Sequence, residues 1–271
     1  MEPILAARIA AIVAGCAFAA YTDARTGLIL DKITCPMIAI GIVLNLLELN
    51  WLFLGAGIAT FAIGYAVYYA GKIGGGDVKL CTGIAFLLPL YGGGIFLLNA
   101  LFAGAILAAA FYSVFFVSKY ARKGIDWKEN RGNMLKTAVF AAIIGAYFWL
   151  LAAMRLLNAE AAALLGFPIG LALVFMALER GIKRSFFLKK VALGKLEEDE
   201  VIAAEFLAAK IRKKLRLNFK GVLGEKEIAL LRKAGIRTVP VYRGMPPFAP
   251  FILLGCAATL IRPDIIGVFF A

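Results

Sequence analysis

The chain has 271 residues, of which 62% are hydrophobic and only 17% are charged, and its mean hydropathy is +0.87. A soluble domain of this length would not show this balance, so the composition excludes an ordinary soluble enzyme. The chain contains no histidine, and its four cysteines are scattered singly, so the sequence offers no zinc-binding motif. We therefore interpret the sequence as that of an all-α polytopic membrane protein.

Apolar stretches recur along the chain, most of them near the length of roughly 17 to 25 residues that a helix needs to cross a bilayer. They predict a bundle of about 6 to 8 transmembrane helices. The expected spans are residues 4–21, 34–49, 51–70, 80–91, 95–118, 137–157, 161–178 and 247–269. The fourth is short and is followed by three glycines, so a tilted or re-entrant segment is the alternative there.

The basic residues gather on one side of this predicted topology. If the N-terminus lies outside, the loops 22–33, 71–79, 119–136 and 179–246 share one side and hold 27 of the 30 Lys and Arg residues. This asymmetry follows the positive-inside rule and makes these loops cytoplasmic. The net charge of +13 therefore needs no nucleic acid as a partner.

The chain divides into three regions: a transmembrane core at 1–178, a basic cytosolic subdomain at 179–246 and a C-terminal transmembrane helix at 247–271. In the subdomain, residues 197–217 combine an acidic start with a basic end, which predicts an amphipathic helix. A second helix at 225–233 and an extended segment at 238–242 follow. We expect a small, mainly helical subdomain whose basic face is solvated, with contact to membrane lipid headgroups as the alternative.

Three carboxylates, Asp23, Asp31 and Asp77, stand at the membrane boundary of the apolar half. Asp23 follows the first span and Asp77 follows the third, so an out-and-back pair of helices returns both to the same face. An ionisable residue at this depth is costly and is by default a functional candidate. A carboxylate pair can cleave an amide: the ionised member takes a proton from water, and the protonated member donates a hydrogen bond to the scissile carbonyl. Such chemistry requires neither a metal nor a cofactor, and we expect none.

Three glycines, Gly74, Gly75 and Gly76, precede Asp77 directly. Glycine permits positive φ and lets another backbone approach closely, which an extended substrate beside a carboxylate would need. We therefore expect the three glycines to mark the approach of substrate backbone to the site. The alternative is a flexible turn whose aspartate is only solvated.

The residues around both carboxylates resemble the motifs of type IV prepilin and preflagellin peptidases. Residues 21–31, YTDARTGLILD, have the Asp, Arg, Ile and final Asp at the spacing of that family's first loop. Residues 74–79, GGGDVK, are similar to its G-x-G-D signature with the trailing Lys. The resemblance covers residues 1–120 and the last span, and it departs from the usual pattern at Leu30 and Asp31.

The resemblance implies a GxGD-type membrane aspartic endopeptidase of archaeal type, with Asp23 and Asp77 as its catalytic pair. Its partners would be type IV pilin-like or archaellin precursors, which lose a short basic leader at the cytoplasmic face of the cell membrane. Arg25, Asp31 and Lys79 are candidate neighbours of the pair that could hold a catalytic carboxylate in place or shift its pKa; the alternatives are that Arg25 and Lys79 only follow the positive-inside rule and that Asp31 is not part of the site. Two other interpretations stay open: an enzyme like presenilin or signal peptide peptidase, and a transporter whose two aspartates bind ions or protons.

Overall fold

The computed structural model describes residues 3–70, 73–156, 159–195, 201–203, 206, 231–232, 238–244 and 246–267. Within these residues the chain forms eight helices of 13 or more residues: α1 (Pro3–Thr26), α2 (Asp31–Leu47), α3 (Trp51–Tyr69), α4 (Gly75–Leu87), α5 (Phe96–Lys123), α6 (Trp127–Ala153), α7 (Ala159–Ile182) and α10 (Ala249–Ile261). Helices α1, α3, α5 and α6 are long and apolar enough to cross a membrane, as is the stretch Leu165–Phe187. The all-α polytopic membrane fold is confirmed.

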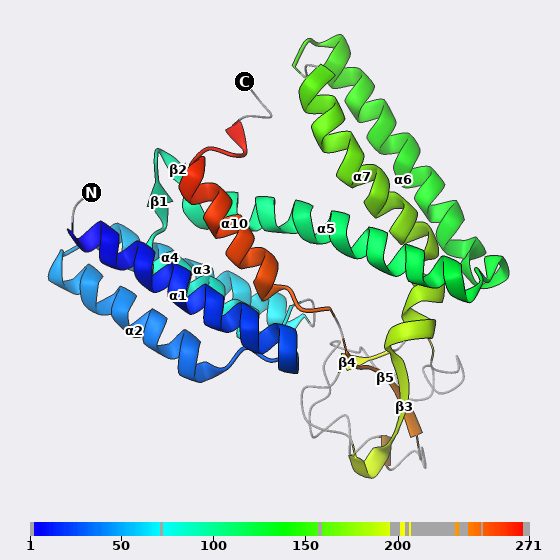
Figure 1. The fold of residues 1–271 in the computed structure, drawn as a ribbon, viewed down its shortest axis with the longest axis horizontal. Coiled ribbons are helices and arrows are strands. Elements are labelled where there is room, and N and C mark those ends of the chain that lie inside the picture. The colour runs from blue at the N-terminus through cyan, green and yellow to red at the C-terminus, as the bar shows by residue number, and fades with distance from the viewer. Residues whose placement is uncertain are drawn as a thin grey trace.

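The helices form two groups joined by α5 (Figure 1). Helices α1 to α4 lie side by side, and α10 packs on both α1 and α5. At its far end α5 meets α7, which pairs with α6 to form an antiparallel hairpin that stands away from the first group (Figure 1). Helix α10 comes late in the sequence, yet it packs against α1. It therefore completes the first group of helices.

The main hydrophobic core lies where α1, α2, α4, α5 and α10 meet. Its fully buried side chains include Ile12, Leu80, Ile84, Phe96 and Ile252. Helix α4 contributes most to this core, since every residue from Leu80 to Leu87 except Cys81 is buried. A side chain in α4 is therefore fixed by neighbours on several sides, and Asp77 stands in the first turn of this helix.

Helix α4 differs from the expected fourth span of residues 80–91. It begins at Gly75, because the glycine run forms its first turn instead of a loop, and it ends at Leu87. The strands β1 (Leu90–Tyr91) and β2 (Gly94–Ile95) then pair as a hairpin. Gly92 and Gly93 have φ of 56° and 86°, and a two-residue hairpin turn commonly requires positive φ at both of its central positions.

The loop expected at 119–136 is also much shorter in the structure. Helix α5 continues to Lys123 and α6 already begins at Trp127. The Asp126 carboxylate accepts a hydrogen bond from the Glu129 backbone N–H at 3.0 Å, and this N-cap interaction starts α6 ten residues before the apolar stretch. The polar residues of this region are thus the ends of two long helices.

The basic subdomain contains a sheet that the sequence analysis missed. After a π-helical turn at Lys183–Phe187, strands β3 (Leu188–Ala192), β5 (Thr238–Tyr242) and β4 (Val201–Ile202) form an antiparallel sheet with β5 in the centre. The extended segment at Thr238–Tyr242 is confirmed. The helix expected at 197–217 is wrong at Val201–Ile202, which pair with β5, and nearly all its other residues lie outside the described part, as does most of the helix expected at 225–233.

Candidate active site

Asp23 lies near the end of α1 and is buried, with 8% of its surface exposed. Its Oδ2 accepts a hydrogen bond of 2.9 Å from the backbone N–H of Ala249, the first residue of α10. The N–H groups in the first turn of a helix have no partner within that helix. Asp23 therefore supplies an acceptor for one of the N–H groups in the first turn of α10. This bond also fixes the direction of the Asp23 carboxylate.

Asp77 is the third residue of α4, and Gly74 is the N-cap of that helix. Its carboxylate has a hydrogen bond with the backbone of Gly74, the arrangement in which a side chain at this position reaches back over the helix start. Asp77 precedes the apolar stretch of α4 and lies outside the five long candidate spans. Burial, and after it the negative charge of Asp23, raise the pKa of Asp77 to about 6, while the Gly74 bond acts in the opposite direction.

The two carboxylates influence each other electrostatically, and each lies at the start of a helix. Asp23 interacts with the N-terminus of α10, and Asp77 lies in the N-terminal turn of α4. A helix N-terminus carries a partial positive charge, which favours negative charge placed beside it. Because burial and the charge of Asp23 raise the pKa of Asp77, Asp77 keeps its proton to a higher pH than an ordinary aspartate does. The site is suited to a reaction in which one carboxylate acts as a base and the other as an acid.

The role expected for the three glycines, the approach of substrate backbone, stays a prediction. None of the three has positive φ, so the fold does not use their freedom to adopt that conformation. Close approach does occur at Gly76, where an added Cβ would lie 2.8 Å from the Cβ of Ile29. An added Cβ at Gly75 would instead meet the Tyr68 ring at 3.5 Å, an ordinary contact. Gly76 therefore lets the loop after α1 pack against the first turn of α4, which brings the two motifs together.

The contacts recorded for the other three motif residues are with partners other than the two carboxylates, and their supporting role stays a prediction. Lys79 Nζ forms an exposed ion pair with Asp31 at 2.6 Å. Arg25 is exposed, with its guanidinium over the ring of Tyr21 at 5.0 Å from the ring centre. Asp31 and Lys79 thus tie the start of α2 to α4, and this bond joins the two motifs at the surface.

Two contributors to the site were not identified from the sequence, and both come from outside the motifs. One is Ala249, which contributes its backbone N–H. A backbone group leaves no recognisable residue pattern in a sequence. The other is Tyr112 on α5, which lies close enough to Asp23 for the charge of the carboxylate to act on the phenol. The proline cluster before α10 was the signal available, since it marks the start of the helix that delivers Ala249.

A buried arginine organises the opposite end of α1, and the sequence analysis missed it too. Arg8 is 3% exposed, donates to the carbonyl of Leu87 at 2.7 Å and forms an ion pair of 2.7 Å with Glu48. It also donates to Asn45, whose own amide donates to the Phe86 carbonyl. Carbonyls at a helix C-terminus lack partners within the helix, so Arg8 satisfies the end of α4 while Asp77 occupies its beginning.

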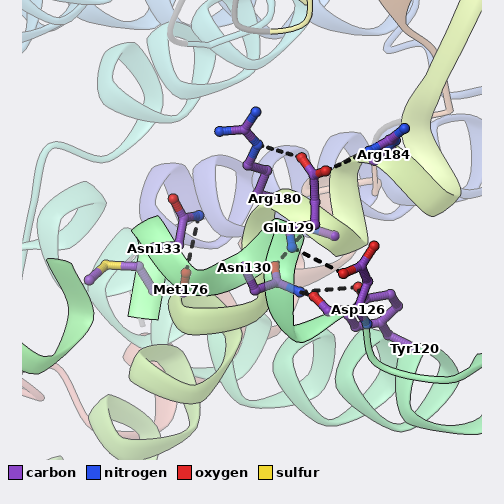
Figure 2. A network of polar contacts seen from close by, with 9 residues as sticks. Tyr120, Asp126, Glu129, Asn130, Asn133, Met176, Arg180 and Arg184 are labelled. Carbon is purple, nitrogen blue, oxygen red and sulfur yellow. Dashed lines mark hydrogen bonds and ion pairs between the residues drawn. The ribbon is translucent and has the colours of Figure 1, made fainter. Parts of the chain in front are cut away.

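A second polar cluster joins α5, α6 and α7, as Figure 2 shows. Glu129 accepts ion pairs from Arg180 and Arg184, and Asn130 donates to the hydroxyl of Tyr120 at 3.1 Å. A surface pocket beside this cluster is lined partly by Tyr120, Glu129 and Arg184, and neither Asp23 nor Asp77 lines it. The cluster holds the α6–α7 hairpin to the end of α5, and it is separate from the carboxylate pair.

Fold and site together define a helical, multi-pass membrane protein with a carboxylate pair at two helix N-termini. Residues 10–109, which include both carboxylates, match the model of the type IV leader peptidase family. Over 82 residues the chain is 39% identical to "Prepilin peptidase EppA" of Methanothermobacter thermautotrophicus, a match that covers 27% of this chain and 21% of that relative. No solved structure matches the chain.

Proposed function

We propose that this protein is a membrane aspartic endopeptidase that removes the short basic leader from type IV pilin-like or archaellin precursors. The observation that carries the proposal is the electrostatic pairing of Asp23 and Asp77 at the N-termini of α10 and α4, within the segment that matches the leader peptidase family. The relative's name supports a precursor of this kind as substrate.

The two carboxylates differ in surroundings, and this difference supports a separate role for each. Asp23 faces a backbone N–H donor at a helix N-terminus, which suits an ionised oxygen, so it would take the proton from the attacking water. The pKa of Asp77 is raised to about 6, so it would hold the shared proton and donate a hydrogen bond to the scissile carbonyl. As the peptide bond breaks, the proton held by Asp77 would pass to the leaving amine.

The proposed reaction takes place at the cytoplasmic face. Loops expected on that face hold 27 of the 30 basic residues, and both aspartates lie at its membrane edge. There water reaches the carboxylates while the apolar helix of the precursor stays in lipid. Cleavage at this depth would release the leader on the side where it was synthesised.

A mobility-shift cleavage assay tests the proposal. Purified protein in lipid is incubated with a pilin-like precursor, and Asp23→Asn and Asp77→Asn are compared with the matched control Asp31→Asn. We expect both dyad variants to lose cleavage by at least 1,000-fold, about 4 kcal/mol of transition-state stabilisation, while the control retains it. Normal processing by either dyad variant would refute the assignment. Ion flux in proteoliposomes without any cleavage would favour the transporter interpretation instead.

The pH dependence gives an independent check on the roles. If Asp77 acts as the acid, kcat/KM falls as pH rises through about 6, because the free enzyme loses the proton that Asp77 must supply. A kcat/KM that keeps rising from pH 6 to pH 8 would contradict the assignment of Asp77 as the acid. The measurement uses initial rates at precursor concentrations well below KM.

A further inference from the structure

The short segment before α10 is held at two points by different helices. The hydroxyl of Tyr112, on α5, donates a hydrogen bond to the carbonyl of Pro247 at 2.6 Å. Two residues later, the N–H of Ala249 donates to Asp23 at 2.9 Å. Tyr112 therefore reaches Asp23 through two residues of backbone.

Helix α5 also holds the body of α10 in place. The ring of Tyr112 packs edge-on against Phe251, with ring centres 5.2 Å apart. An added Cβ on Gly104 of α5 would lie 2.5 Å from the Phe251 carbonyl oxygen, and one on Gly255 of α10 would lie 2.0 Å from the Ala100 carbonyl oxygen. The two backbones touch along this seam, so α10 has little freedom to slide. This seam begins at Phe251, two residues after Ala249, so the direction of the Ala249 N–H also depends on what holds the segment before α10.

We propose that Tyr112 is a positioning residue for Asp23, acting through Pro247 and the N–H of Ala249. The inference rests on the proposed peptidase function, and Tyr112 lies outside the segment 10–109 that matches the family. Without the Tyr112 hydroxyl, the turn at Pro247 loses a strong anchor and the N–H of Ala249 can swing relative to α1. Asp23 then samples orientations in which it no longer faces the attacking water.

A loss of orientation of the Asp23 carboxylate should change kcat and leave KM nearly unchanged. Catalytic groups must be held within about 0.5 Å of the productive geometry, so small changes in orientation lower the rate of the chemical step. Precursor binding would involve the short basic leader and the apolar helix that follows it, and it depends little on the direction of one carboxylate. Tyr112→Phe should therefore lower kcat about tenfold and leave KM unchanged within about twofold.

Tyr120→Phe is the matched control. It removes a buried hydroxyl from the same helix, and this hydroxyl contacts Asn130 and the Asp126 N–H instead of the segment before α10. We expect the control to lower thermal stability at least as much as Tyr112→Phe while keeping kcat. Equal losses of kcat in both variants would show a general effect on α5 and would overturn the proposal, as would an unchanged kcat in Tyr112→Phe.

A double-mutant cycle separates this proposal from the peptidase function. The melting temperatures of Tyr112→Phe, Asp23→Ala and the double variant are compared, and the same cycle is made with Tyr120→Phe. If Tyr112 positions Asp23, the two effects are coupled and do not add, whereas the control cycle is additive. Additive effects in the Tyr112 cycle would overturn the positioning role. If the cycle is coupled but the protein shows no peptidase activity, the proposed function is refuted while the positioning role is kept.

Discussion

Replacing Asp77 by Asn should make the protein more stable at neutral pH. Burial and the charge of Asp23 raise the pKa of Asp77 from 3.8 to about 6 in the folded state. Above pH 6 the folded protein contains a charge that its surroundings disfavour, whereas below pH 3.8 the carboxyl is protonated in both folded and unfolded states. Stability therefore falls as pH rises from about 4 to about 6. A difference of about two pH units corresponds to a cost of about 3 kcal/mol, which is an upper limit because Asp77 is only partly buried.

Asparagine cannot ionise and retains an oxygen that can accept the Gly74 hydrogen bond. At pH 7.5 we expect Asp77→Asn to raise the free energy of unfolding by up to about 3 kcal/mol, and at pH 4 by close to nothing. Thermal unfolding in detergent between pH 4 and pH 8 measures the difference. Asp31→Asn is the control, because its exposed ion pair with Lys79 is worth at most about 1 kcal/mol. A variant that is no more stable than the wild type at pH 7.5, or equally stabilised at pH 4, would refute the reasoning.

Two further substitutions test packing around the site. Gly76→Ala forces a Cβ to within 2.8 Å of Ile29, so we expect a loss of about 1 to 3 kcal/mol and slower cleavage, while Gly75→Ala has room and should leave both properties near wild type. Equal effects of the two alanines would contradict the close approach at Gly76. Arg8→Met leaves Glu48 and the Leu87 carbonyl without their partner, and we expect a loss of about 3 kcal/mol in denaturant titrations. A stable Arg8→Met variant would show that water replaces the arginine.

The carboxylate pair was accessible from sequence because its signals are local. The position of each aspartate at the end or start of a span, together with two short motifs, was enough to place Asp23 and Asp77 on one face. The spans themselves follow from apolar length, which is why the helices of the membrane fold were expected. The predicted start of the fourth span lies several residues after the start of α4, because a run of glycines at a helix N-terminus has the pattern of a loop in the sequence.

The missed features depend on residues far apart in the chain. Arg8 reads as a stray charge on the outer side until α2 and the end of α4 pack around it. Strand β4 has only two residues, and acidic and basic neighbours give its surroundings the pattern of an amphipathic helix. Its pairing with Thr238–Tyr242 decides its conformation, and that pairing crosses some 40 residues of sequence, a distance over which local propensity says nothing.

The bond between Ala249 and Asp23 joins residues that are 226 positions apart in the sequence. Synthesis runs from the N-terminus, so α1 is made well before α10. A growing chain therefore contains both aspartates long before it contains the donor that orients one of them. The carboxylate pair acquires its final geometry only after α10 has been made and has packed against α1.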